Sequence, residues 1–211
     1  MGSGTFGNVG MTARTASPQH RAAVFIDKDG TLIEDVPYNT NPARVRFTPN
    51  ALCGLQQLAR CNFALFIATN QPGLADGRIA WPAFDALRAH IDQRLRDDAA
   101  IGLDGWCVCP HAPASASTVA CACRKPAPGL LCDAAAAHDI DLARSWMVGD
   151  ILDDIEAGRR AGCSTVLLDV GNETVWHVTP QREPHHRCAD LGAAAAWIVA
   201  HTPPAAAGLD A

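Results

Sequence analysis

Short apolar runs alternate with longer amphipathic segments along this chain. The short runs are bounded by polar or turn-forming residues, which is typical of buried strands. The longer segments carry apolar residues at helical spacing. Alternation of this kind predicts an α/β fold in three layers, with a mostly parallel sheet between two layers of helices. We predict strands at 22–26, 63–68, 106–109, 146–148 and 165–168.

Helix start signals divide the remaining segments. Thr48 followed by Pro49 predicts an N-cap and first turn for a helix that runs to residue 60. Further helices are predicted at 81–98, 128–138, 151–161 and 190–201. Nearly half of the residues are hydrophobic (48%), which is enough for the core of one domain over 21–202. We expect residues 1–20 to be a flexible N-terminal extension and residues 203–211 a disordered tail.

Charge and apolar length narrow the classes of partner. The net charge of −5 offers no broad basic surface and argues against a nucleic-acid partner. Because no window is long and apolar enough for a membrane span, and no leader signal opens the chain, we expect a cytoplasmic protein without a membrane partner. We expect a monomer. The nine cysteines are an odd number, which predicts thiols or metal ligands rather than a complete disulfide framework.

Two carboxylates follow the first predicted strand directly. In the run from Asp27 through Lys28, Asp29 and Gly30 to Thr31, residues two apart can face the same way. Neighbouring carboxylates repel each other unless a divalent cation or a proton lies between them. The pair therefore predicts a metal site, although an isolated Asp-x-Asp more often caps a turn.

Three more polar groups follow later strands or lie in a loop. Thr69 and Asn70 follow the second strand, Arg124, Lys125 and Pro126 form a loop, and Gly149 and Asp150 precede Asp153 and Asp154. Each group alone has another interpretation: a strand-end turn, a solvated cation, or acids that stabilise a helix N-terminus. Together they are expected at the carboxyl edge of the sheet, where open α/β sheets bind ligands.

In this order the four groups resemble the motifs of the haloacid dehalogenase (HAD) superfamily of phosphohydrolases, over about residues 24–168. The resemblance implies a HAD-like Rossmannoid fold. It also implies that Asp27 is the nucleophile that forms an aspartyl-phosphate and that Asp29 acts as general acid and then base. Mg²⁺ would be held by Asp27, the main-chain carbonyl of Asp29, and Asp150.

The same resemblance assigns the remaining catalytic groups. Thr69 and Lys125 would bind the oxygens of the transferring phosphoryl group. Asp154, or alternatively Asp153, would hold a water on the metal.

Two short pairs of metal-ligand residues lie between the second and third polar groups. Cys109 and His111 form one pair, and Cys121 and Cys123 form the other. Three thiolates and one imidazole can complete a tetrahedral, structural Zn²⁺ site in a loop over 109–123. The alternative is that these cysteines are small apolar residues of the core. Cys107 shares a strand face with Cys109 and could compete as a ligand.

This cysteine-rich loop, followed at once by Arg124 and Lys125, resembles the D-glycero-D-manno-heptose-1,7-bisphosphate 7-phosphatases and the related histidinol-phosphate phosphatases. In that family the loop stands in for a cap domain, so a capless enzyme is expected. The resemblance implies removal of the 7-phosphate of a heptose bisphosphate, a small phosphorylated sugar of lipopolysaccharide precursor metabolism. Arg124 suits a second, non-reacting phosphate. Substrate contacts are implied at Asp35, Val36, Pro37, Tyr38, Thr69, Asn70, Gln71, Pro72, Arg124 and Lys125.

Ile151 departs from the family, because heptose phosphatases often carry a Lys directly after the metal-binding Asp. This difference weakens the transfer of exact substrate and anomer preference, but it does not touch the hydrolytic groups. Four alternatives stay open: a histidinol-phosphate phosphatase, another small sugar-phosphate phosphatase, a nucleic-acid 3′-phosphatase, and a noncatalytic zinc-stabilised binding module.

Overall fold

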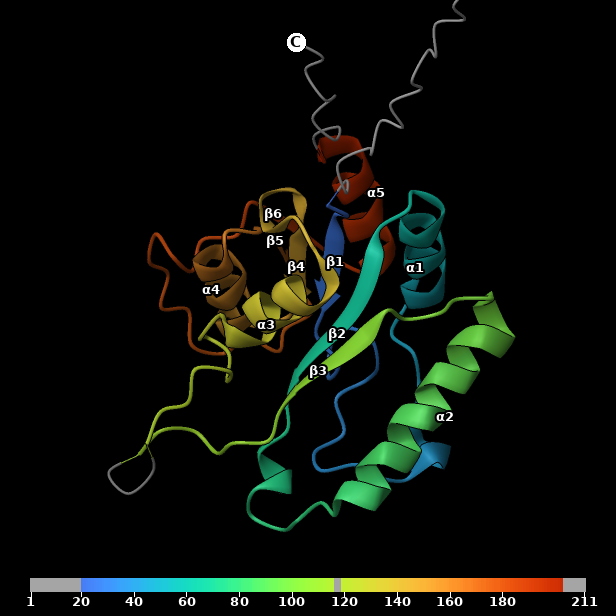
Figure 1. Cartoon of the computed structure of the whole chain (residues 1–211), viewed down its shortest axis with the longest axis vertical. Helices are drawn as coiled ribbons and strands as arrows, with labels where there is room; N and C mark the ends of the chain where they lie inside the picture. The colour runs from blue at the N-terminus through green and yellow to red at the C-terminus, as the bar shows by residue number, and fades with distance from the viewer. Residues whose placement is uncertain (1–19, 116–118, 203–211) are drawn as a thin grey trace, which may run out of the picture.

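The computed structural model describes residues 20–115 and 119–202 and contains a six-stranded, wholly parallel sheet with helices on both faces (Figure 1). The predicted α/β class is confirmed. The segments predicted as a flexible extension and a tail lie outside the described residues, apart from residue 20. The strands are β1 Ala23–Ile26, β2 Ala64–Asn70, β3 Gly105–Cys109, β4 Trp146–Gly149, β5 Ser164–Leu168 and β6 His186–Cys188.

The helices form two layers because each strand sends alternate side chains to opposite faces. On one face Val24 and Ile26 of β1 pack in a core shared with α1, α2 and α5. On the other face Phe25 packs in a second core with α3, and α4 covers Leu167 of β5. The helices are α1 Ala51–Arg60, α2 Trp81–Ala99, α3 Gly129–His138, α4 Leu152–Ala161 and α5 Leu191–His201.

The strand order is β3-β2-β1-β4-β5-β6. The chain builds outward from β1 through β2 to β3 and then returns to place β4 on the other side of β1, where Asp27 N donates to Val148 O at 2.9 Å. Ligand sites of open parallel sheets lie at such a switch point, outside the carboxyl ends of the two diverging strands. Asp27 and Asp150 are the residues that follow β1 and β4.

The start of α1 and the number of strands differ from the sequence prediction. Helix α1 begins at Ala51 rather than at Pro49, and its N-cap residue Asn50 has left-handed backbone geometry. The hydroxyl of Thr48 does not cap this helix, because it donates to the carbonyl of Thr31 at 2.6 Å and so ties the chain to the turn after β1. The segment before α5, for which no strand was predicted, contains the short edge strand β6.

The segment between β1 and α1 contains only a three-residue helix, Pro42–Arg44, which agrees with the expected capless architecture. In the described part of the chain, no helix is long and apolar enough to cross a membrane.

Candidate active site

Lys125 lies in the loop between β3 and α3, and its side chain is buried at the carboxyl edge of the sheet. The ammonium lies 2.5 Å from Asp27 Oδ1 and 2.6 Å from Asp154 Oδ1, and it donates to the carbonyl of Ala68 at 2.7 Å. An ammonium group has three N–H donors, and these three acceptors match them. The buried cation therefore joins the ends of β1 and β2 to the first turn of α4.

Asn70, at the end of β2, holds the backbone of Lys125 from both sides. Its amide oxygen accepts from Lys125 N at 3.1 Å, and its amide nitrogen donates to Lys125 O at the same distance. The peptide bond that follows, to Pro126, is cis. Asn70 was predicted as a substrate contact, and in the structure its side chain positions the loop that carries Lys125.

Asp150 follows β4 and is almost fully buried. Its Oδ1 accepts from the hydroxyl of Thr31 at 2.9 Å, and its Oδ2 accepts from the side-chain amide of Asn172 at 2.8 Å. Gly30 has a positive φ of 83°, and a side chain there would collide with Asp150. The glycine thus allows the turn after β1 to lie against the carboxylate that follows β4.

Asp29 lies beside Asp27 but has different partners. Lys28 Nζ donates to its Oδ1 at 2.6 Å, and Gln71 Nε2 donates to its Oδ2 at 2.9 Å. The same Gln71 nitrogen donates to Thr69 Oγ1 at 2.9 Å. The two predicted catalytic groups Asp29 and Thr69 are therefore linked through one amide.

The carboxylates of Asp27, Asp150 and Asp154 form a candidate metal centre, because one oxygen from each lies within 4.8 Å of the others. With Lys125 they carry three negative charges and one positive charge, which leaves two negative charges when all are ionised. Oxygen donors are the ligands that Mg²⁺ prefers, and a dication balances this charge. The residues present therefore fit magnesium. The side chain of Asp29 is outside this group, and the ligand predicted there was its main-chain carbonyl.

Burial raises the pKa of Asp27 and of Asp150, the carboxyl groups that directly follow β1 and β4. Burial is the largest cause for Asp27, and Asp154 and Asp29 add repulsion, so that its pKa is about 7 in spite of Lys125. Burial and the charge of Asp27 raise the pKa of Asp150 to about 6. For Lys125 burial lowers the pKa, but the carboxylates of Asp154 and Asp27 outweigh it and raise the pKa above its usual value. Without a bound cation, the positive charge near these two carboxyl groups is therefore too small to keep their pKa values at the ordinary level.

Other predicted residues lie at the rim of the site or away from it. Asp153 pairs with Arg182 and is not part of the three-carboxylate centre. Tyr38 is exposed, with the guanidinium of Arg78 stacked on its ring 4.0 Å from the centroid. Arg124 Nη1 donates to His111 O at 3.1 Å. The remaining substrate contacts that the family resemblance implies, Asp35, Val36, Pro37 and Pro72, lie in the segments that follow β1 and β2.

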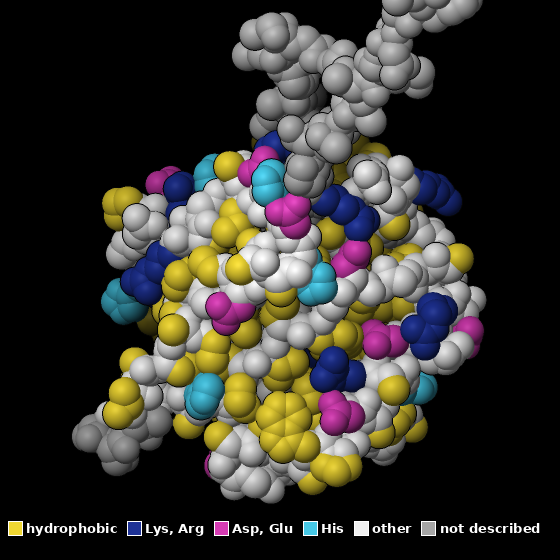
Figure 2. Space-filling model, viewed as in Figure 1, with side chains coloured by type: hydrophobic (Ala, Val, Ile, Leu, Met, Phe, Trp, Pro, Cys, Tyr) yellow, Lys and Arg dark blue, Asp and Glu magenta, His cyan; other side chains and the backbone are white. Residues whose placement is uncertain are grey.

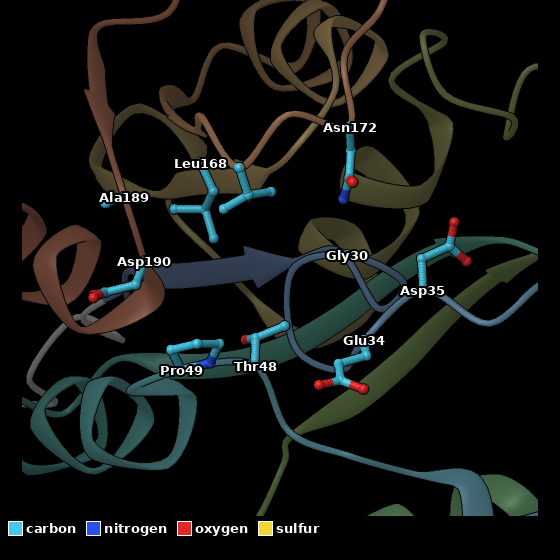
Figure 3. A pocket seen from close by; sticks show the side chains of 10 residues that line it. Gly30, Glu34, Asp35, Thr48, Pro49, Leu168, Asn172, Ala189 and Asp190 are labelled. Carbon is cyan, nitrogen blue, oxygen red and sulfur yellow. The ribbon is translucent and has the colours of Figure 1, made fainter.

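A cavity of about 350 Å³ lies next to this centre, on the side of β5 and β6 (Figure 3). Its polar lining includes Glu34, Asp35 and Asn172, and its apolar lining includes Leu168 and Val170. Gly30 lines the cavity, and a Cβ added to it would collide with Asp150, so the cavity and the metal centre lie next to the same turn, which carries no side chain at this position.

The four predicted zinc ligands come together at the end of β3. The distances between their ligand atoms run from 3.2 Å, for His111 Nδ1 to Cys123 Sγ, to 3.7 Å, for Cys109 Sγ to Cys121 Sγ. A tetrahedral Zn²⁺ with bonds of about 2.3 Å to sulfur separates its ligands by about 3.8 Å. The cluster could therefore hold this ion. Cys107 is outside this group of four ligand atoms.

Two residues that contact Asp150, Thr31 and Asn172, were not predicted as site residues from their sequence positions. Thr31 lies inside the motif after β1, and the signal for its role was its position beside the two aspartates. Asn172 lies in the loop after β5, and no spacing or composition marks it. Only the fold brings its amide to Asp150.

Comparison with known proteins agrees with this arrangement. The HAD-hydrolase-like family model matches residues 122–194. The Escherichia coli (strain K12) D-glycero-beta-D-manno-heptose-1,7-bisphosphate 7-phosphatase is 36% identical over 165 residues, which cover 76% of this chain and 84% of that protein. The protein of the same name from Mesorhizobium japonicum is 34% identical over 161 residues, which cover 75% of this chain and 74% of that protein.

A solved structure leads to the same group. The D,D-heptose 1,7-bisphosphate phosphatase from B. bronchiseptica, complexed with magnesium and phosphate, superimposes with a TM-score of 0.70 at 29% identity, over 85% of this chain and 98% of that one. The fold and the aspartate-lysine site define a HAD-like phosphatase. Within that class, the chain belongs to the family of the D-glycero-beta-D-manno-heptose-1,7-bisphosphate 7-phosphatases.

Stabilisation by magnesium is expected to grow from pH 5.5 to pH 8, because protons compete with the metal for Asp27 (pKa about 7) and Asp150 (pKa about 6). In the metal-free protein both pKa values are raised above that of an ordinary carboxyl group, so these groups stabilise the fold at low pH and lose that effect as the pH rises through their folded pKa values. Thermal unfolding with Mg²⁺ and with EDTA across this range measures the difference. An equal difference at pH 5.5 and pH 8 would contradict the assignment.

Proposed function

We propose that this protein is a magnesium-dependent phosphomonoesterase in which Asp27 is the nucleophile and forms an aspartyl-phosphate. The observation that supports this most strongly is the buried ammonium of Lys125, which bridges Asp27 and Asp154 next to Asp150. A carboxylate that attacks a phosphate dianion meets repulsion of about 4 kcal/mol for each charge pair at contact, with an effective dielectric constant near 20. Lys125 offsets part of it, and Mg²⁺, which Asp27, Asp150 and the main-chain carbonyl of Asp29 would hold, would supply the rest of the positive charge.

Asp29 is placed for the proton transfers. It protonates the leaving oxygen and then takes a proton from the water that hydrolyses the aspartyl-phosphate. Lys28 and Gln71 fix the direction of its two oxygens beside Asp27. Gln71 Nε2 also donates to Thr69, so the amide keeps a hydrogen-bond partner when a substrate oxygen replaces the amide at Asp29. The Thr69 hydroxyl, with Lys125, binds the transferring phosphoryl group.

We further propose that the substrate is D-glycero-β-D-manno-heptose 1,7-bisphosphate and that the 7-phosphate is removed. The names of the relatives support this choice, as does Arg124, which directly precedes Lys125 and offers a planar guanidinium for a second phosphate. Histidinol phosphate is the second candidate. On the face seen in Figure 2, basic side chains are interspersed with acidic ones and form no continuous patch, which disfavours a nucleic-acid substrate.

Zn²⁺ is proposed as a structural ion held by Cys109, His111, Cys121 and Cys123. Two of these residues accept from Arg124: its backbone N–H donates to Cys121 Sγ at 3.3 Å, and its guanidinium donates to His111 O. The loop thus takes the place of a cap domain by holding a substrate-binding arginine next to the catalytic lysine. The predictions of a monomer and of a cytoplasmic location remain open.

Phosphate release in the presence of Mg²⁺ tests the substrate assignment. We expect the 1,7-bisphosphate of the β-anomeric heptose to give a higher kcat/KM than its α-anomer, histidinol phosphate, fructose bisphosphate or a 3′-phosphorylated oligonucleotide. A higher kcat/KM for histidinol phosphate would contradict the heptose assignment and favour a histidinol-phosphate phosphatase. If phosphate is released from the oligonucleotide at low salt and this activity is lost at high salt, the result would favour a nucleic-acid 3′-phosphatase.

Replacement Asp27→Asn is expected to lower kcat by about 10³-fold or more, because an amide oxygen is a poor nucleophile at phosphorus. The fold should survive, since a carboxyl group with a pKa of about 7 is already partly neutral. Phosphate release and thermal unfolding measure the two effects. Asp97→Asn on the surface of α2, where the carboxylate accepts from Gln93, is the matched control and should keep full activity. Full activity of the Asp27→Asn protein would eliminate the nucleophile assignment.

Removal of zinc is expected to raise the KM for the bisphosphate and to expose the segment 109–123 to proteases before the sheet unfolds. The reason is that the ion joins ligands 12 residues apart along the chain and fixes the backbone that holds Arg124. Metal analysis, limited proteolysis and kinetics on the chelated protein and on Cys121→Ser measure this. Cys61→Ser, an exposed thiol outside the cluster, is the control. Freshly purified, reduced protein without zinc would contradict the proposal.

A further inference from the structure

The loop between β5 and β6, residues 169–185, contacts the segment 150–156 at three places. Asn172 Nδ2 donates to Asp150 Oδ2 at 2.8 Å. Glu173 Oε2 accepts from the backbone N–H of Leu152 at 2.9 Å. Arg182 pairs with Asp153 and, at 3.1 Å, with Glu156. In Figure 1 this loop runs beside α4, the helix that begins two residues after Asp150.

Asn172 completes the hydrogen bonding of Asp150. Thr31, in the turn after β1, donates to one oxygen of Asp150. Asn172, in the loop after β5, donates to the other oxygen. Two donors on two oxygens fix the rotation of the carboxylate and leave one remaining lone pair on each oxygen for a cation. The amide also lies close to Gly30, where an added Cβ would be 2.5 Å from Asn172 Nδ2. Figure 3 shows the Asn172 amide directed toward the Gly30 turn.

Glu173 anchors the asparagine that precedes it. One of its oxygens accepts from the first turn of α4, and the other accepts from Val175 N at 2.8 Å within the loop. An acidic side chain at a helix N-terminus is favoured by the free N–H groups and the helix dipole. The carboxylate therefore keeps the backbone of Asn172 at a constant place relative to Asp150, and the pairing of Arg182 secures the far end of the loop.

We propose that Asn172 is a positioning residue for the magnesium site and sets its affinity through the orientation of Asp150. This inference rests on the proposed Mg²⁺ site of Asp27 and Asp150. Side chains that hold a metal ligand by a hydrogen bond typically change metal affinity by about 10- to 100-fold when removed. Asn172 also lines the cavity of about 350 Å³, so a direct contact with substrate is the competing role. The two roles differ in whether Mg²⁺ affinity or substrate KM changes.

Asn172→Leu removes the donor at nearly constant volume. The Mg²⁺ concentration at the midpoint of thermal stabilisation, measured without substrate, is expected to rise about tenfold or more. The Mg²⁺ concentration for half-maximal phosphate release should rise by the same factor. At saturating Mg²⁺, kcat and the substrate KM should match those of the unchanged protein. Asn172→Gln, which keeps an amide on a longer side chain, should recover part of the affinity.

Two control variants separate a specific loss of Mg²⁺ affinity from a general effect on the loop or the fold. Val175→Ala changes an exposed side chain of the same loop and should leave the Mg²⁺ midpoint unchanged. Asn172→Ala serves if the leucine variant does not fold, and the unfolding temperature of each variant in EDTA shows whether the metal-free fold is intact. A variant with the unchanged midpoint, or one whose kcat stays low at saturating Mg²⁺, would overturn the proposal.

Failure of the positioning role is distinguishable from failure of the proposed function. A protein that is stabilised by Mg²⁺ but releases no phosphate from any sugar phosphate would contradict the function and still allow the thermal comparison. A protein that Mg²⁺ does not stabilise at all would remove the metal site and, with it, the role of Asn172.

Discussion

The structure of this site depends on one buried ion-pair network, in which the ammonium of Lys125 lies between the carboxylates of Asp27 and Asp154. None of the three charges is stable alone at this depth, because burial disfavours the charged form of each. Together they offset the loss of hydration, and breaking such a buried pair typically costs about 3–5 kcal/mol. The network therefore obliges three separate segments, after β1, after β3 and at the start of α4, to meet at one point.

The same network leaves a deficit of positive charge. Three carboxylates outnumber one ammonium, and the raised pKa values of Asp27 (about 7) and Asp150 (about 6) express that deficit. A dication would balance this charge. It would also lower the repulsion between a phosphate dianion and a carboxylate. The cysteine cluster meets this centre through adjacent residues, because Arg124 is bonded to the cluster and Lys125 to the aspartates.

Much of the architecture was predictable because the information is local. The apolar runs that predicted five strands were confirmed within two residues at each end, since buried parallel strands need such runs. Two errors, a missed strand and a misplaced helix start, have physical causes. Strand β6 has three residues with partly exposed side chains at the edge of the sheet, so it leaves no apolar signal. Thr48 has the residue type of a helix cap, but its hydroxyl is used by the turn after β1.

The sequence by itself determined the class of fold, the order of the aspartate, threonine, lysine and aspartate motifs, and the residue types of both candidate metal centres. These follow from local periodicity and from the chemistry of side chains a few residues apart. Only the tertiary structure decided that Lys125 bridges Asp27 and Asp154, that Asn70 holds the lysine loop, and that Asn172 reaches Asp150. Those contacts join residues that are tens of positions apart, and sequence spacing carries no information about which of the many polar side chains the packed sheet and loops bring within hydrogen-bond distance.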